Sequence, residues 1–275
     1  MKKILIAIPN FNNAPFIKDA IFSVLNQQLS VGFNIDVVVF DNASTDDSVN
    51  VIRTIASKYE SVSLICNDIN VGAIPNHNLC IEYAIEFGYD FLKILSSDDV
   101  LLPNIINRQV EILSNDDRVD IASCSMMITN EDLNSGIHYS FLKEAGKEVL
   151  RVNPETIMFK SMEKAQNLLG GPSNTMLRVI AIRDVRFQAK FSWLSDLQFA
   201  FDILKKSAGD FVYIEQPGFL YRRHSNTDTE AIARKKGLQT HEWLTFINDN
   251  RREHRFIFRR SILKVKSWFH RLRAF

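Results

Sequence analysis

Short apolar-rich segments alternate with helical patterns through the first hundred residues of this 275-residue chain, and this alternation restricts the fold more than any other feature. The first segment, residues 4–8, has no polar residue, which is typical of a strand that is buried on both faces. The stretches between these segments carry apolar residues at spacings of three and four, as amphipathic helices do. The expected strands are 4–8, 35–40, 62–66 and 91–95. Repeated strand–helix units predict an α/β fold in which a mostly parallel central sheet is flanked by helices.

The intervening helices are expected from their apolar faces and from their start signals. Ser44, followed three residues later by Asp47, fits an N-cap that opens the second helix, and Pro103 begins the fourth. The apolar residues of the first three helices are Ile17, Ile21, Val24 and Leu25, then Val51, Ile52 and Ile55, then Ile74, Ile81 and Ile85. After about residue 118 the alternation loosens. The expected elements there are strands at 119–129, 175–178, 211–214 and 218–222, helices at 155–168 and 196–205, and a turn at 170–173.

Polar clusters follow three of the expected strands at the point where each strand ends. The clusters begin at Pro9, Asp41 and Ser96, and they include Asn10, Phe11, Ser97, Asp98 and Asp99. Ligands of open α/β sheets bind beyond the carboxyl ends of the strands. The three clusters therefore predict one site at one edge of the sheet.

Two common ways of binding phosphate are missing from the sequence. The loop after the first strand contains no glycine, so the dinucleotide-binding pattern is absent, and there is no P-loop pattern. A divalent metal held by carboxylates is the usual alternative. Asp98 and Asp99 offer hard oxygen ligands that suit Mg²⁺ or Mn²⁺.

Each of these charged residues also has a purely structural interpretation. Asp98 and Asp99 would serve only to turn the chain, because Asp is common in turns. Asp41 would cap the next helix or form a turn through local hydrogen bonds instead of reading a uracil or thymine ring. Asp196 would be an acidic residue at a helix start, where the helix dipole favours it, and His224 would be a surface histidine.

Charge is unevenly distributed along the chain although the formal net charge is only +1. Residues 231–275 contain 12 Lys or Arg and 3 Asp or Glu, whereas residues 1–230 contain 21 and 29. This asymmetry predicts a domain of residues 1–229 and a distinct C-terminal extension of residues 230–275. The three cysteines match no metal or redox spacing, and the first apolar run stops at Pro9. We therefore expect a cytoplasmic protein with reduced thiols and no signal peptide.

The last part of the extension has an amphipathic helical pattern. One apolar stripe is formed by Phe258, Ile262, Val265, Phe269 and Leu272, with Lys and Arg outside it. One interpretation is a helix docked on the preceding domain or on a second subunit, which would make a homo-oligomer. The other is an interfacial helix on the anionic inner face of a membrane. Nucleic-acid binding is not expected, because the chain has no recognisable reading module.

Seven segments, taken together and in order, resemble glycosyltransferase family 2, a group of inverting enzymes with the GT-A fold. The resemblance runs from about Ile4 to Thr229. The segments are IAIPNFNNAPFIKDAIFSVLNQ, VVVFDNASTDDS, NDINVGAIPNHNLCIEYA, FLKILSSDDVLLP, GGPSNTMLR, WLSDLQFAFDIL and EQPGFLYRRHSNT. Each segment alone is weak evidence, but seven in register on a matching strand–helix pattern are highly specific.

The resemblance implies a role for individual residues. The nucleotide-binding residues would be Pro9, Asn10, Phe11, Asp41, Asn70, Gly72, Asn78, Ser97 and Arg222, with Asp41 reading the base. The metal, Mg²⁺ or Mn²⁺, would be held by Asp98, Asp99 and His224. Asp196 matches the acidic residue that takes the proton of the acceptor as general base.

Three positions depart from the usual pattern of the family. Ser96 stands where the first Asp of the metal motif is frequent, Ser195 where Glu often precedes the base, and Asn42 where a second Asp is frequent. With fewer carboxylates, the metal is expected to bind weakly without nucleotide.

The function implied by the resemblance is the transfer of a sugar from a UDP- or dTDP-type nucleotide-sugar donor to a hydroxyl of a saccharide or lipid-linked saccharide. The expected setting is bacterial surface polysaccharide or lipopolysaccharide synthesis, with the enzyme cytoplasmic or peripheral on the inner face of the membrane. A sugar-phosphate nucleotidyltransferase is disfavoured because the segment NFNNAP lacks a glycine-rich loop with a basic residue. A non-catalytic nucleotide-sugar-binding relative or scaffold is disfavoured because Asp98 and Asp196 are both present.

Overall fold

The first half of the chain forms four parallel strands, as the sequence predicts. The computed structural model describes residues 1–225, 235 and 237–250. The strands are β1 (Lys2–Asn10), β2 (Phe33–Asp41), β3 (Val62–Cys66) and β4 (Phe91–Ile94). They pair in the order β3-β2-β1-β4, and every pairing among them is parallel. The crossovers contain α1 (Ile17–Leu25), α2 (Ser48–Ala56) and α3 (Ala73–Glu86).

The second half extends the same sheet with strands of mixed direction. β6 (Val119–Thr129) and β10 (Asp210–Arg222) pair in parallel, and β9 (Met176–Arg178) lies between β4 and β6, antiparallel to both. The other strands are β5 (Val100–Leu101), β7 (Gly136–Tyr139) and β8 (Val149–Val152). The full order is β3-β2-β1-β4-β9-β6-β10-β5, with β7 on β6 and β8 on β10. The predicted α/β fold with a mostly parallel central sheet is confirmed.

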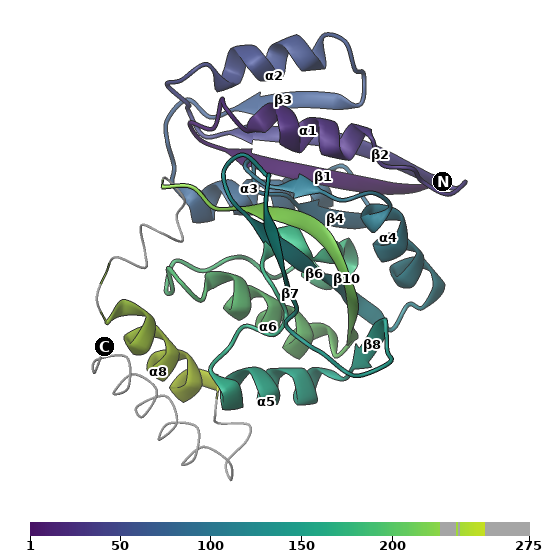
Figure 1. Cartoon of the computed structure of the whole chain (residues 1–275), viewed down its shortest axis with the longest axis vertical. Helices are drawn as coiled ribbons and strands as arrows, with labels where there is room; N and C mark the ends of the chain where they lie inside the picture. Colours follow the sequence, from purple (N-terminus) through teal and green to yellow (C-terminus); the bar gives the residue numbers. More distant parts are fainter. Residues whose placement is uncertain (226–234, 236, 251–275) are drawn as a thin grey trace.

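Helices cover both faces of the sheet and form two apolar cores (Figure 1). The helices of the second half are α4 (Ile105–Asn115), α5 (Pro154–Lys164), α6 (Ser195–Ser207) and α8 (Leu238–Asn250). One core holds α1, α2 and α4, and the other holds α3, α5, α6 and α8. In β1, Ile4, Ile6 and Ile8 contribute to the first core, while Leu5 and Ala7 contribute to the second. All five are completely buried, which explains why the apolar run has no polar interruption.

Ser44 does not cap a helix, so this prediction is wrong. α2 begins at Ser48, and its N-cap residue, Asp47, makes no side-chain cap bond. The Ser44 hydroxyl donates instead to Asp41 Oδ2 at 2.7 Å, and the Ser44 backbone N–H donates to Asp41 Oδ1 at 2.9 Å. A carboxylate is a strong hydrogen-bond acceptor, and Asp41 lies only three residues before Ser44. Both bonds therefore hold Ser44 in the loop after β2. Ala43, with φ 60°, interrupts any helical path through this loop.

Several element boundaries also differ from the prediction. The two strands expected at 211–214 and 218–222 form one strand, β10, with register shifts around Pro217, where a bulge accommodates the missing N–H of proline. The helix expected at 155–168 ends at Lys164, because Ala165 adopts a left-handed conformation with φ 48°. β5, β7 and β8 were not predicted, since segments of two to four residues are too short to show a period.

The helix α8 lies in the predicted C-terminal extension but packs on the main domain. Trp243, Phe246 and Ile247 are buried in the same core as α6. The ring centroid of Phe246 lies 4.9 Å from that of Phe201 in α6. The described part of the extension therefore completes this core, while the boundary between residues 229 and 230 stays a prediction. The amphipathic pattern that begins at Phe258 lies outside the described residues.

Among the described helices, none combines the length and the apolar character that a membrane span requires.

Candidate active site

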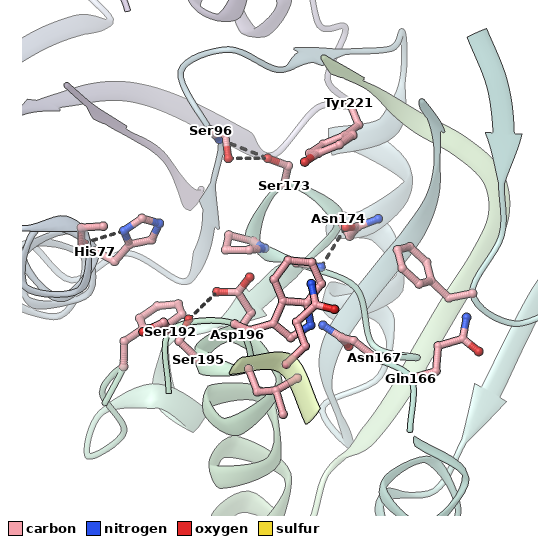
Figure 2. A pocket seen from close by; sticks show the side chains of 18 of the residues that line it. His77, Ser96, Gln166, Asn167, Ser173, Asn174, Ser192, Ser195, Asp196 and Tyr221 are labelled. Carbon is pink, nitrogen blue, oxygen red and sulfur yellow. Dashed lines mark hydrogen bonds between the residues drawn. The ribbon is translucent and has the colours of Figure 1, made fainter. Parts of the chain in front are cut away.

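Several segments that are distant in the sequence line one cavity of about 1500 Å³. Among them are residues 72–75 and His77 at the start of α3, Ser96 and Asp99 after β4, the turn 171–174, the loop 192–196 that leads into α6, and Gln239 and Trp243 of α8. Residues of β6, β7 and β10 and the segment 163–167 line it as well. Figure 2 shows Asp196 pointing into this space, with Ser96, Ser173 and Tyr221 on the opposite side and His77 beside it. The residues after β4 and the start of α6 thus meet at one cavity.

Asp98 and His224 form a close pair, although neither is among the residues that line the cavity. His224 Nε2 lies 3.0 Å from Asp98 Oδ2, and the His224 ring lies 4.6 Å from the ring of Phe16. Two ligand atoms at right angles around Mg²⁺, each about 2.1 Å from the ion, are about 3.0 Å apart. The separation and the chemistry of the pair therefore suit two neighbouring metal ligands. Within the described residues, no group of three or more His, Cys, Asp or Glu side chains has the arrangement of a metal site.

Asp99, which the sequence also predicts as a metal ligand, is buried and uses both oxygens within the protein. Oδ2 accepts from the Ser173 hydroxyl at 2.6 Å, and Oδ1 accepts from the Arg222 backbone N–H at 3.2 Å. Burial and the neighbouring charge of Asp98 raise the pKa of Asp99 well above its usual value, although these hydrogen bonds oppose the shift. In this geometry Asp99 ties the end of β4 to the turn at 172–174 and to the end of β10.

Arg222 is also directed into the protein. Its guanidinium donates to the Asp98 carbonyl at 2.9 Å and to Asp19 Oδ2 at 2.9 Å, and it lies over the ring of Phe16 at 4.7 Å. It donates as well to the Glu131 carbonyl. The side chain is almost fully buried, so it fixes the loop that carries Asp98 and brings positive charge close to it.

Beneath the turn at 172–174 lies a lysine that the sequence analysis did not single out. Lys93 is fully buried, and its ammonium donates to the Ser173 carbonyl at 2.7 Å and to Gln109 Oε1 at 3.2 Å. Desolvation lowers the pKa of Lys93 to about 8, with small opposing effects from Cys124 and Asp99. Lys93 interrupts an otherwise apolar segment. Nothing in such a segment indicates from the sequence alone that its lysine is buried.

Asp196 lies in the first turn of α6, and its carboxylate faces the turn at 171–174. A Cβ at Gly171 would lie 3.5 Å from Asp196 Oδ2, so the glycine leaves the approach to this oxygen open. The Ser195 hydroxyl lies 3.5 Å from Oδ1. Desolvation raises the pKa of Asp196, and the nearby His77 and the Ser195 hydroxyl partly oppose the shift. A carboxylate of raised basicity at a cavity wall is able to accept a proton from a bound hydroxyl.

His77 belongs to the same wall, and the sequence analysis missed it. Its Nδ1 lies 2.8 Å from the Ala73 carbonyl. A carbonyl oxygen only accepts, so Nδ1 carries a proton and donates this hydrogen bond. The residue falls within the segment NVGAIPNHN, but nothing in its spacing distinguishes it from a partly exposed helix residue.

The family model described as "Glycosyl transferase family 2" matches residues 5–186, about two thirds of the chain. The chain belongs to this family. It is a glycosyltransferase.

Proteins of similar sequence include two bacterial ones. An uncharacterized glycosyltransferase of Haemophilus influenzae is 24% identical over 224 residues, which are 81% of this chain and 80% of that protein. The minor teichoic acid biosynthesis protein GgaA of Bacillus subtilis is 26% identical over 126 residues, which are 46% of this chain and 28% of that protein.

Solved structures share the fold of this glycosyltransferase at low sequence identity. TarS 1-349 of S. aureus in complex with UDP-GlcNAc has a TM-score of 0.66 at 16% identity, covering 84% of this chain. This chain spans only 61% of that structure. The mannosyltransferase PcManGT of Pyrobaculum calidifontis, in complex with GDP-Man and Mn²⁺, has a TM-score of 0.64 at 17% identity, covering 97% of this chain and 69% of that one. These likenesses confirm the predicted GT-A fold.

Asp41, which is predicted to bind the nucleobase of the donor, is buried and forms local hydrogen bonds. Besides its two bonds to Ser44, its Oδ2 accepts from Asn10 Nδ2 at 2.8 Å. This is the local arrangement that the sequence left open as an alternative. Asn10 Oδ1 is buried beside it and has no hydrogen-bond partner among the described residues. An unpaired buried acceptor is costly, so an N–H of a ligand would be stabilised there.

The departure at Asn42 has a structural reason. Its side-chain oxygen accepts from the Val71 backbone N–H at 2.9 Å, and its side-chain nitrogen donates to Asn70 Oδ1 at 3.0 Å and to the Gly72 carbonyl at 3.3 Å. An Asp here would face two acceptors without a proton to donate. Asn42 therefore holds the loop before α3, where Gly72 adopts φ +90°.

The structure brings some of the predicted site residues together and separates others. Of the predicted residues, Gly72, Asp99 and Asp196 line one cavity, together with Ser96, which was not predicted as a site residue. Asn78 is not among its lining residues, because both atoms of its amide bind the Phe187 backbone at 2.8 and 3.0 Å. Of the other predicted nucleotide-binding residues, Pro9 and Asn10 lie at the end of β1, Phe11 is half-exposed after it, and Ser97 after β4 is buried and bonded to Asn13 at 2.7 Å. Asp41 ends β2, Asn70 lies in the loop before α3, and Arg222 ends β10. Their ligand roles stay predictions.

Proposed function

We propose that this glycosyltransferase moves a sugar from a UDP- or dTDP-type nucleotide sugar to an acceptor hydroxyl in one in-line displacement. The observation that carries the proposal is the placement of the Asp196 carboxylate in the wall of a cavity that Asp99 and Gly72 also line. The acceptor oxygen forms a bond to the anomeric carbon while the bond from that carbon to the diphosphate breaks. The electron pair of the broken bond leaves on the diphosphate, and the configuration of the carbon is inverted.

Asp196 takes the proton of the attacking hydroxyl in this mechanism. Desolvation raises its pKa, which brings its basicity closer to that of an efficient base near neutral pH. Gly171 leaves the approach to its carboxylate open. Protonation at acidic pH removes the acceptor lone pair, so transfer should fall as pH falls through the raised pKa of Asp196.

Asp98 and His224 are the residues that would hold Mg²⁺ or Mn²⁺. A bound divalent ion supplies charge that neutralises the departing diphosphate. Arg222 adds positive charge, since its guanidinium lies 2.9 Å from the Asp98 carbonyl. Asp99 would keep the Asp98 loop in place through Ser173, whose hydroxyl lies 2.6 Å from its carboxylate. The complex of PcManGT with GDP-Man and Mn²⁺, which has the same fold, supports the use of a divalent metal but does not identify its ligands in this chain.

A nucleotide-sugar donor is supported from two sides. The complexes of TarS with UDP-GlcNAc and of PcManGT with GDP-Man join the GT-A fold to such donors. The unpaired Asn10 Oδ1 at the end of β1 would accept an N–H of a nucleobase.

The acceptor is proposed to be a saccharide or a lipid-linked saccharide. Aromatic side chains that line the cavity on the Asp196 side, among them Trp193 and Trp243, provide apolar faces for sugar rings. The similarity to GgaA supports a place in the synthesis of bacterial surface polymers. We propose that residues 258–275 hold the enzyme on the anionic inner face of the membrane, where a lipid-linked acceptor resides.

An Asp196→Asn variant tests the central assignment. It should keep donor affinity, measured by thermal shift with Mn²⁺ present, and should lose transfer by about 10²–10⁴-fold, the usual contribution of a general base. Asp202→Asn is the matched control, because Asp202 lies on the same helix and burial also raises its pKa, yet it binds Gln198 and Gln188 away from the cavity. Normal turnover by Asp196→Asn would show that this residue is not the base.

A further inference from the structure

The loop that leads into α6 is folded around a carboxylate from α8. Glu242 Oε1 accepts from the Ser192 backbone N–H at 2.8 Å, and Oε2 accepts from the backbone N–H groups of Trp193 at 2.8 Å and Leu194 at 3.1 Å. Three consecutive N–H groups that converge on one anion form a nest. Glu242 is buried, so water does not compete for these hydrogen bonds.

This loop carries the acceptor side of the site. Trp193 lines the cavity, and Asp196 follows Leu194 by two residues, in the first turn of α6. The N-cap residue of α6, Leu194, has no side-chain hydrogen bond of its own to fix the start of the helix. The position of the helix start therefore depends on the bonds that the loop makes to Glu242.

α8 is itself held firmly against α6. Phe246 and Ile247 are completely buried, and Asn250 accepts from Lys205 Nζ at 2.7 Å at the far end of the contact. Two further residues of α8, Gln239 and Trp243, line the cavity. A rigid helix thus presents one carboxylate to the loop that contains the predicted base.

We infer that Glu242 is a positioning residue of the glycosyltransferase, which sets Asp196 and Trp193 against the acceptor by anchoring residues 192–194. The inference rests on the proposed role of Asp196. Glu242 does not contact the reacting atoms, and it acts through the loop alone. The segment around α8, which charge alone marks as a separate extension, then belongs to the active site.

The test is Glu242→Gln, which keeps the size of the side chain but has one acceptor oxygen in place of two. At least one N–H of the loop then faces an amide N–H₂ group, and the loop shifts. Transfer should fall by about tenfold to a hundredfold, because a misplacement of about 1 Å is enough for such a loss. Donor affinity, measured by thermal shift, should stay within about twofold, since the donor side of the site is untouched.

A second readout separates positioning from loss of stability. If the loop loosens, water reaches Asp196, the desolvation that raises its pKa is reduced, and the pKa falls toward the ordinary value. The acidic limb of the pH–rate profile should then move to lower pH. Asn250→Ala is the matched control: it breaks the bonds of α8 to Lys205 and Gln198 in α6 and leaves residues 192–194 alone. It should lower the melting temperature without changing turnover or the acidic limb.

The outcomes distinguish this inference from the proposed function. Normal turnover by Asp196→Asn defeats the base assignment whatever Glu242 does. An inactive Asp196→Asn together with a Glu242→Gln enzyme that behaves like Asn250→Ala overturns only the inference. If Glu242→Gln does not fold, Glu242→Asp, shorter by one methylene, must show the same losses in weaker form. Full turnover with an unchanged pH profile in that variant overturns the inference as well.

Discussion

Replacing Lys93 by methionine should change how the stability of the enzyme depends on pH. Lys93 is completely buried beneath the turn at 172–174, and its partners are two backbone carbonyls and Gln109 Oε1 instead of a carboxylate. Desolvation lowers its pKa from the ordinary 10.5 to about 8. Methionine has a similar length and no charge, so the variant removes the titration while filling the same space.

The sign follows from the two pKa values. Because the folded pKa lies below the unfolded one, the charged lysine reduces stability at neutral pH, and stability rises as pH increases from about 8 to about 10.5. One pKa unit corresponds to about 1.4 kcal/mol, so the full effect is about 3 kcal/mol. Between pH 7 and pH 10 the wild-type free energy of unfolding should gain about 2.5 kcal/mol relative to Lys93→Met. Other groups titrate in both proteins and largely cancel in the difference.

Urea unfolding at pH 7, 8, 9 and 10, followed by circular dichroism, measures this difference. Lys58→Met controls for the loss of one positive charge, because Lys58 is exposed. The free energies of unfolding of wild type and Lys93→Met should diverge as pH rises, in favour of wild type. Parallel curves for these two proteins would refute the reasoning and would mean that the ammonium is as well stabilised by its carbonyl partners as by water.

Three further predictions concern other parts of the molecule. Gly218→Ala should destabilise the fold by about 1–3 kcal/mol, because the new Cβ would lie 2.3 Å from Cys124 Sγ and 2.5 Å from Ile105 Cγ1. Calorimetry should show a lower melting temperature, and an unchanged melting temperature would contradict this packing. Asp98→Asn should weaken both Mn²⁺ and nucleotide binding in titration calorimetry, and full wild-type activity in excess chelator would exclude a metal-dependent mechanism. The full chain should sediment with anionic vesicles at low salt and less at high salt, whereas a chain ending near Arg252 should stay in solution with its donor binding intact. If the full chain ignores such vesicles, the docked-helix or dimer interpretation of the tail is correct.

The strands of the first half were predictable because burial on both faces demands a local signal. Ile4 to Ile8 must be apolar at every position, since adjacent residues enter different cores. This constraint is visible in consecutive residues of the sequence, so the strand is predictable without knowing which strands pair with it. The short strands β5, β7 and β8 leave no comparable trace, because their pairing depends on β6 and β10, which lie elsewhere in the chain.

The family motifs predicted a site but did not assign the hydrogen bonds among its residues. Asp196 and Asp99, which the motifs predict as site residues, both line the cavity. Both carboxylate oxygens of Asp99, however, accept hydrogen bonds within the protein, from Ser173 and Arg222. Asn78 was predicted to bind nucleotide, and its amide clamps Phe187, 109 residues away. A motif gives the residue type and the strand end; it carries no information about which distant backbone group lies opposite.

The order of strands and helices in the first half of the chain, the predicted edge of the sheet for the site and the membership of the family follow from residues that are close together in the sequence. Hydrophobic periodicity and short motifs are local properties, so they can be recognised from the sequence alone. The roles of Lys93, His77 and Glu242 follow only from the packed chain. Each depends on partners brought together by tertiary contacts, such as the 48–50 residues that separate Glu242 from the N–H groups it binds. Burial then gives these contacts their energy, because a charge or a polar group without water must find its partner within the protein.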